Sequence, residues 1–146
     1  MKIYKKIINI KSTAQIEFID ITDQVNEVIE TSGVRTGQVL VYSPHTSASV
    51  IINHNETMLK QDFMRVLYRL VPISDKYSHD AFELKSASKS DGRSNGHSHC
   101  KGMLLGVSET VPVEKGVAML TEKQSIFLVE FDGARTRDII IQVMGL

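Results

Sequence analysis

All five histidines of the chain fall in one stretch, at His45, His54, His79, His97 and His99. Histidine is the commonest metal ligand in proteins and the usual acid–base group near neutral pH. Three or four neutral imidazoles can hold Zn²⁺ or a similar divalent ion, and three leave one coordination position open for water. The spacing matches neither the helical HExxH pattern nor a cysteine-based zinc motif. Surface histidines without a ligand are therefore the alternative that the spacing leaves open.

The local structure around residue 98 decides how many histidines can share a site. His97 and His99 would lie on one face of a strand, but on a helix they would point roughly 200° apart. A helix would therefore bring only one of the two to a site, and we favour His99 because it is closer to an apolar run, residues 103–105. Asp80 beside His79 either orients another imidazole or begins a short helix at residues 81–85.

A second group of chemistry-bearing residues follows a strongly apolar segment, in the run EFDGARTR. Arg135 and Arg137 alternate with one residue between them, so in an extended chain both guanidinium groups project the same way. Two such groups on one face suit a phosphate or pyrophosphate. The alternative is a hairpin in which the two arginines form salt bridges with Glu130 and Asp132.

Several polar residues near His45 can serve either a substrate or the fold. Thr46 and Ser47 can offer hydroxyl groups to a phosphate, and they are equally ordinary at the end of a strand. Asn53 can contact a substrate, although capping of the helix that follows explains it as well. We interpret Cys100 as a buried and inert thiol because apolar residues follow it.

Composition limits the functions that these residues can serve. With 146 residues the chain is one domain, 1–146, and its 42% hydrophobic and 23% charged residues are ordinary for a globular protein. Seventeen basic and seventeen acidic residues cancel, so we expect neither nucleic acid nor a membrane as partner. No apolar run reaches the ~18 residues of a membrane helix. A single cysteine fits a reducing compartment, so we expect a cytoplasmic protein.

The elements that must position these residues are strands with two main helices. The sequence predicts strands over 2–11, 15–21, 37–42, 49–53, 108–113, 117–121, 124–131 and 136–144. The long apolar runs of the last two indicate that both of their faces are covered. A first helix is capped by Thr22, places Val25, Val28 and Ile29 on one face, and ends at Gly33. A second covers 56–70, capped by Asn55, with a predicted buried stripe of Leu59, Phe63, Val66, Leu67 and Leu70. Residues 86–96 form a loop, and 97–106 fit either a helix or a strand. The fold class is therefore α+β, mostly antiparallel.

Eight segments together resemble one known family, the YjbQ family, often labelled secondary thiamine-phosphate synthase. The resemblance runs from about residue 37 to the C-terminus. The matching segments are HTSASVIIN (45–53), QDF (61–63), LVP (70–72), YSHDAFE (77–83), NGHSHCKGMLLG (95–106), VPVEKG (111–116), QSIFLVEFDGARTR (124–137) and QVMG (142–145).

The resemblance implies an α+β homotrimer that packs its sheets around a threefold axis, with a pocket near the subunit boundary. By position, the family's histidines correspond to His45, His79 and His99, often with His97, and these would hold zinc or a similar divalent metal. Its charged run corresponds to Glu130, Asp132, Arg135 and Arg137. Those residues would bind and orient a small phosphorylated metabolite.

The activity attributed to the family joins hydroxymethylpyrimidine diphosphate to thiazole phosphate and releases pyrophosphate. Lys123 would add a cation for the pyrophosphate, although the family usually has Trp at that position. His54 and Ala134 also depart from the family's usual Glu and Pro. We therefore expect a small metal-assisted enzyme for a phosphorylated or anionic metabolite, with His45, His79, His99 and Glu130 as its catalytic residues. The alternative is a non-catalytic homotrimer that binds a metal or an anion.

Overall fold

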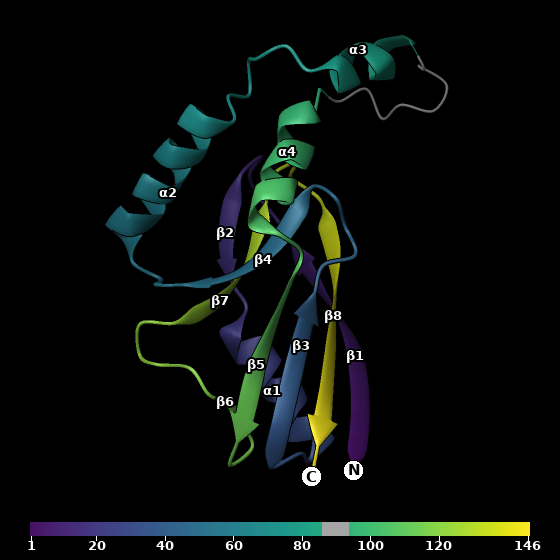
Figure 1. The fold of residues 1–146 in the computed structure, drawn as a ribbon, viewed down its shortest axis with the longest axis vertical. Helices are drawn as coiled ribbons and strands as arrows, with labels where there is room; N and C mark the ends of the chain where they lie inside the picture. The colour runs from purple at the N-terminus through teal and green to yellow at the C-terminus, as the bar shows by residue number, and fades with distance from the viewer. Residues whose placement is uncertain (86–93) are drawn as a thin grey trace.

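Two antiparallel sheets form the body of the molecule (Figure 1). The computed structural model describes residues 1–85 and 94–146, with the backbone alone for 82–85. The predicted loop over 86–96 therefore lies mostly outside the described residues. The larger sheet has the order β1-β8-β3-β5-β6 and the smaller one the order β2-β7-β4. The strands are β1 (Lys2–Lys11), β2 (Glu17–Asp20), β3 (Thr36–Tyr42), β4 (Ala48–Asn53), β5 (Ser108–Glu114), β6 (Val117–Ala118), β7 (Ser125–Glu130) and β8 (Thr136–Gly145).

Among the described residues, four helices connect these strands. Helices α1 (Thr22–Ser32) and α2 (Thr57–Leu70) are the two main helices predicted, and α3 (Ser78–Lys85) and α4 (Gly96–Leu105) are the shorter helices that the sequence left open around residues 81–85 and 97–106. The α+β, mostly antiparallel fold is confirmed. Helix α4 settles the ambiguous segment, so His97 and His99 cannot share one face.

The side chains at the starts of α1 and α2 do not cap these helices as the sequence predicted. Glu56, rather than Asn55, accepts the backbone N–H groups of Met58 and Leu59 at the start of α2. At α1, Thr22 makes no cap and instead donates its hydroxyl to Asp20. Gly33 ends α1 as predicted, with a left-handed φ of 68° that a side chain disfavours.

The central strand of the smaller sheet, β7, is buried on both faces, as its long apolar run predicted. Ile126 and Leu128 pack into the main core with α1, while Phe127 and Val129 face a second cluster with Leu67 of α2. Side chains alternate across a strand, so one strand serves two cores. This rigid layer ends at Glu130, where the charged run begins.

Among the residues that the structure describes, the larger sheet is covered on one face only. Ile139, Ile141 and Val143 of β8 are buried on the side of α1, which lies behind the sheet in Figure 1. On the other face Ile7, Ile140 and Tyr42 are paired across β1, β8 and β3. Ile7 is 53% exposed there. The expectation that both faces of β8 are covered is therefore met on one face alone.

Helix α2 is less buried than its apolar stripe predicted. Leu67 is the buried member, whereas Val66 and Leu70 are 53% and 66% exposed. The reason is its placement: α2 projects from the body and lies along one side of β4 and β2 (Figure 1). Periodicity predicts which residues share a face of a helix, but not how much of that face meets a sheet.

Candidate functional site

The charged run after β7 forms a buried ion pair. Arg137 donates its Nε to Glu130 Oε1 at 2.9 Å and its Nη2 to the Ser47 hydroxyl at 2.9 Å. Ser12 donates its hydroxyl to the same carboxylate at 2.7 Å. Burial opposes ionisation of Glu130, but these hydrogen bonds outweigh it and hold its pKa below the usual value. Three predicted site residues, Glu130, Arg137 and Ser47, are thus engaged with one another inside the chain.

Arg135 forms the second ion pair of the run. Its Nη2 lies 2.8 Å from Asp132 Oδ2, and its Nε donates to the Asp132 carbonyl oxygen at 2.9 Å. The structure therefore shows the salt-bridge alternative for both arginines. Gly133 permits this turn because a Cβ there would lie 2.0 Å from the Ala14 carbonyl oxygen.

Two predicted site histidines face each other across an open cleft. The rings of His79 and His99 are 4.8 Å apart between centroids, edge to face at 79°. They come from α3 and α4, and the cleft between them has a volume of about 450 Å³. The described residues that line it are Thr46, Tyr77, Ser78, His79, Gly96, His99 and Cys100. Two helices and the end of the β3–β4 connection thus meet at one site.

Small residues let α4 approach the other walls of this cleft. A Cβ at Gly96 would lie 2.5 Å from Tyr77 Cβ, and a Cβ at Gly102 would lie 2.8 Å from the Thr46 carbonyl oxygen. Any larger side chain would push the helix away from α3 or from β4. The two glycines therefore set the width of the cleft.

Asn95 links the cleft to the charged run. Its Oδ1 lies 3.0 Å from His79 Nε2, and its Nδ2 donates a hydrogen bond to Asp132 Oδ2 at 2.9 Å. The predictions did not include Asn95, because Asn-Gly before a helix is equally typical of a turn. Asp80, for which we left two roles open, accepts the Gly96 backbone N–H at 2.8 Å. It therefore fastens α4 to α3 rather than orienting a histidine through that oxygen.

His97 lies on the opposite, fully buried face of α4. Its Nδ1 is 2.7 Å from the Lys101 ammonium, and both side chains are 0% exposed. Burial lowers the pKa of Lys101 to about 8. Burial, and then the Lys101 charge, lower the pKa of His97. A cation at Nδ1 would meet an ammonium already in place, so His97 does not fit the predicted metal site within one chain.

His45 stands at the end of β3, where backbone groups of β8 hold it. Its Nε2 lies 3.1 Å from the Asp138 carbonyl oxygen and 3.0 Å from the Asp138 backbone nitrogen. Burial, and then the nearby Arg137 charge, lower the pKa of His45, while the bond to Asp138 opposes them. His45 is not among the residues that line the cleft, although its neighbour Thr46 is.

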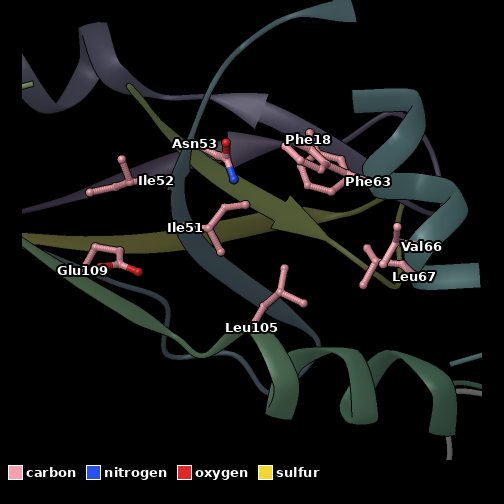
Figure 2. A pocket seen from close by; sticks show the side chains of 9 residues that line it. All are labelled: Phe18, Ile51, Ile52, Asn53, Phe63, Val66, Leu67, Leu105 and Glu109. Carbon is pink, nitrogen blue, oxygen red and sulfur yellow. The ribbon is translucent and has the colours of Figure 1, made fainter. Parts of the chain in front are cut away.

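Two further predicted substrate-binding residues, besides those of the charged run and Ser47, are not among the residues that line the cleft. Lys123 is exposed on the turn between β6 and β7. Asn53 lines a second cavity of about 410 Å³, which Figure 2 shows with Phe18, Phe63 and Leu105 around Ile51. This cavity is apolar, with Asn53 and Glu109 as its polar residues. Cys100, predicted to be buried, is half-exposed and lines the cleft.

Whether the cleft could hold a metal ion depends on its two histidines. Among the described residues, no group of three or more His, Cys, Asp or Glu side chains converges as a metal site would require. His79 and His99 fit as two imidazole ligands. A single chain therefore offers a two-histidine site whose remaining positions would fall to substrate, water or another chain.

Comparison with known proteins adds a family and solved structures. The family described as "UPF0047 protein YjbQ-like" matches residues 6–146. A UPF0047 protein of Methanothermobacter thermautotrophicus is 37% identical, covering 99% of this chain and 94% of its own. One from Archaeoglobus fulgidus is 39% identical, covering 94% and 98%. A crystal structure from Sulfolobus solfataricus, titled a YbjQ-like protein of unknown function, superposes with a TM-score of 0.89 at 30% identity, covering 99% of both chains.

Within the part of the chain that the structure describes, no helix combines the length and the apolar character needed to cross a membrane.

Proposed function

We propose, from the premise that this chain belongs to the UPF0047 family of YjbQ-like proteins, that it acts on a phosphorylated metabolite in the His79–His99 cleft. The observation that carries the proposal is the pair of imidazoles at 4.8 Å on two helices, open to a cleft of about 450 Å³. Imidazoles at this distance can hold one divalent cation or pass a proton.

A divalent ion bound by the two histidines would supply a Lewis acid for a phosphate oxygen. The chain's own residues have the tasks of binding and orientation. His79 and His99 take the anionic end of the substrate, by hydrogen bonds from the rings or through the ion. Thr46 offers a hydroxyl, and Tyr77 offers an aromatic surface on the same cleft. Arg135, held by Asp132, adds positive charge beside Asn95.

Thiamine-phosphate synthesis is the specific reaction that we propose as a weak side activity. The thiazole nitrogen forms a bond to the methylene carbon of hydroxymethylpyrimidine diphosphate, and the carbon–oxygen bond to pyrophosphate breaks. The nitrogen is already a nucleophile, so orientation and cations for the leaving pyrophosphate suffice. This demand is modest and matches a cleft with two histidines.

A specific observation favours the alternative, a binding protein without catalysis. Both arginines of the charged run are engaged in ion pairs, with Glu130 and with Asp132. A cleft that holds an anion through two imidazoles alone would bind it without strongly stabilising a leaving group. Turnover, rather than binding, distinguishes the two functions.

We propose in addition that the protein is a cytoplasmic homotrimer built on the larger sheet. The row Ile7, Ile140 and Tyr42 supports this, because the described part of the chain leaves this apolar row across three strands uncovered. Light scattering on the purified protein would give about three times the chain's 16.3 kDa. A mass equal to one chain would contradict the trimer.

The decisive experiment is titration of the metal-free protein with Zn²⁺, followed calorimetrically with and without pyrophosphate. Wild-type protein should bind Zn²⁺, and pyrophosphate should tighten the binding. His99→Ala should weaken Zn²⁺ binding at least tenfold because one of the two imidazole ligands is lost. His54→Ala is the matched control, since His54 is a histidine that does not line the cleft.

Two outcomes would count against the proposal. Wild-type protein that binds neither Zn²⁺ nor pyrophosphate would remove the cleft as a site for either ligand. An equal loss in His54→Ala and His99→Ala would show that Zn²⁺ binds adventitiously. If binding is specific, release of pyrophosphate from hydroxymethylpyrimidine diphosphate and thiazole phosphate separates the enzyme from the binding protein.

A further inference from the structure

The orientation of the Asn95 amide follows from its two partners. Asp132 is a carboxylate, which only accepts, so the amide nitrogen of Asn95 must face it at 2.9 Å. Asp132 is itself fixed by Arg135 at 2.8 Å, and it is 5% exposed. The amide oxygen of Asn95 is then the atom that faces His79 Nε2 at 3.0 Å.

This orientation determines which nitrogen of His79 carries hydrogen. An amide oxygen has no hydrogen to give, so the hydrogen bond requires a proton on Nε2. A neutral imidazole has one protonated nitrogen, and Nδ1 therefore carries the lone pair. A carboxylate in place of Asn95 would also favour the positively charged ring. The amide selects the tautomer without adding that charge.

Asn95 also begins the helix that carries the second histidine. Its backbone carbonyl accepts the N–H groups of Ser98 at 3.0 Å and of His99 at 3.3 Å, in the first turn of α4. Asn95 is 9% exposed, so its contacts hold it largely out of water. One residue thus orients the ring of His79 and anchors the turn that presents His99.

We propose that Asn95 is a positioning residue that holds the His79 ring through its Nε2 and fixes that ring as the Nε2–H tautomer. The chain of contacts runs from Arg135 through Asp132 and Asn95 to His79. A role of this tautomer in catalysis rests on the proposed function, whereas the tautomer itself is a property of the protein without any ligand.

The test is nuclear magnetic resonance of protein labelled with ¹⁵N in its histidine rings, at about pH 8, where an ordinary histidine is neutral. His79→Gln assigns the signals. The wild-type His79 ring should show a protonated Nε2 and an unprotonated Nδ1. In Asn95→Ala the ring should become a mixture of tautomers, whereas Asn95→Asp retains an acceptor and should retain the Nε2–H form. Asn55→Ala is the matched control, because that amide bonds Asp20 away from the cleft.

Zn²⁺ affinity gives a second readout. Loss of an orienting partner typically weakens metal binding 10–100-fold, so we expect a fall of about this size in Asn95→Ala. A wild-type His79 with its proton on Nδ1, or one unchanged in Asn95→Ala, would overturn the inference. The wild-type spectrum decides even if the variants fail to fold. If Zn²⁺ and pyrophosphate do not bind while the tautomer is as stated, the proposed function fails and the inference stands.

Discussion

The Glu130–Arg137 pair and the His79–His99 pair are built from residues that the sequence nominates equally for chemistry, but they differ in access to water. Glu130 and Arg137 are 0% and 3% exposed. Their polar atoms form hydrogen bonds with each other and with Ser12 and Ser47. His79 and His99 are half-exposed and line a cleft. The comparison teaches that, in this fold, burial separates charges that hold the chain together from groups that can meet a ligand.

Breaking the buried pair should produce the largest effect on stability. Arg137→Ala leaves the Glu130 carboxylate buried without its cation, and such losses cost about 3–5 kcal/mol. Chemical denaturation at neutral pH measures the loss. Arg137→Ala combined with Glu130→Gln should recover part of it, because the uncompensated charge is then gone. A loss below about 1 kcal/mol in Arg137→Ala would mean that the pair does not stabilise the fold.

Lys101 should produce an intermediate effect that depends on pH. Its pKa falls from 10.5 to about 8 on folding, so the unfolded chain holds this proton more tightly. The resulting penalty is complete below pH 8 and is relieved as pH rises from 8 to 10.5, so stability should rise across that range. At about 1.4 kcal/mol per pKa unit, the total is about 3 kcal/mol.

Lys101→Met removes this ammonium while keeping an unbranched side chain of similar length. The variant should be about 2 kcal/mol more stable at pH 7, since it loses the penalty but also the hydrogen bond to His97. Its stability should rise less than that of the wild type between pH 8 and 10.5. Urea denaturation at several pH values checks both points. A less stable variant with an unchanged pH profile would show that the Lys101 charge is well compensated in the fold.

Changes at the cleft should produce the smallest effects on stability. His99→Ala should cost less than about 1 kcal/mol, because His99 is half-exposed and its ring packs on one side against His79. Arg135→Ala, in the more exposed ion pair of the charged run, should cost about 1 kcal/mol. Thermal unfolding of both variants beside Arg137→Ala measures the contrast. A loss of 3 kcal/mol in His99→Ala would place the histidine pair among the structural contacts.

Local patterns predicted most of the elements. The continuous apolar run of β7 predicted a strand covered on both faces, and the i, i+3, i+4 spacing of Val25, Val28 and Ile29 predicted the buried face of α1. Helix α4 was ambiguous because glycines at both ends and polar residues on its buried face hide any apolar period. The stripe of α2 was predicted, but its exposure depended on a sheet distant in sequence.

The sequence by itself determined the family, the α+β class and the set of chemistry-bearing residues, because these depend on residue type and local order. Only the tertiary structure decided that His79 and His99 share a cleft, that His97 is paired with Lys101, and that Asn95 orients His79. The His79–His99 and Asn95–His79 contacts join α3 to α4 and its first turn, and no local period specifies how such elements pack. The burial of a residue and its side-chain contacts are fixed only when distant segments pack together, and they determine whether the residue stabilises the fold or can meet a ligand.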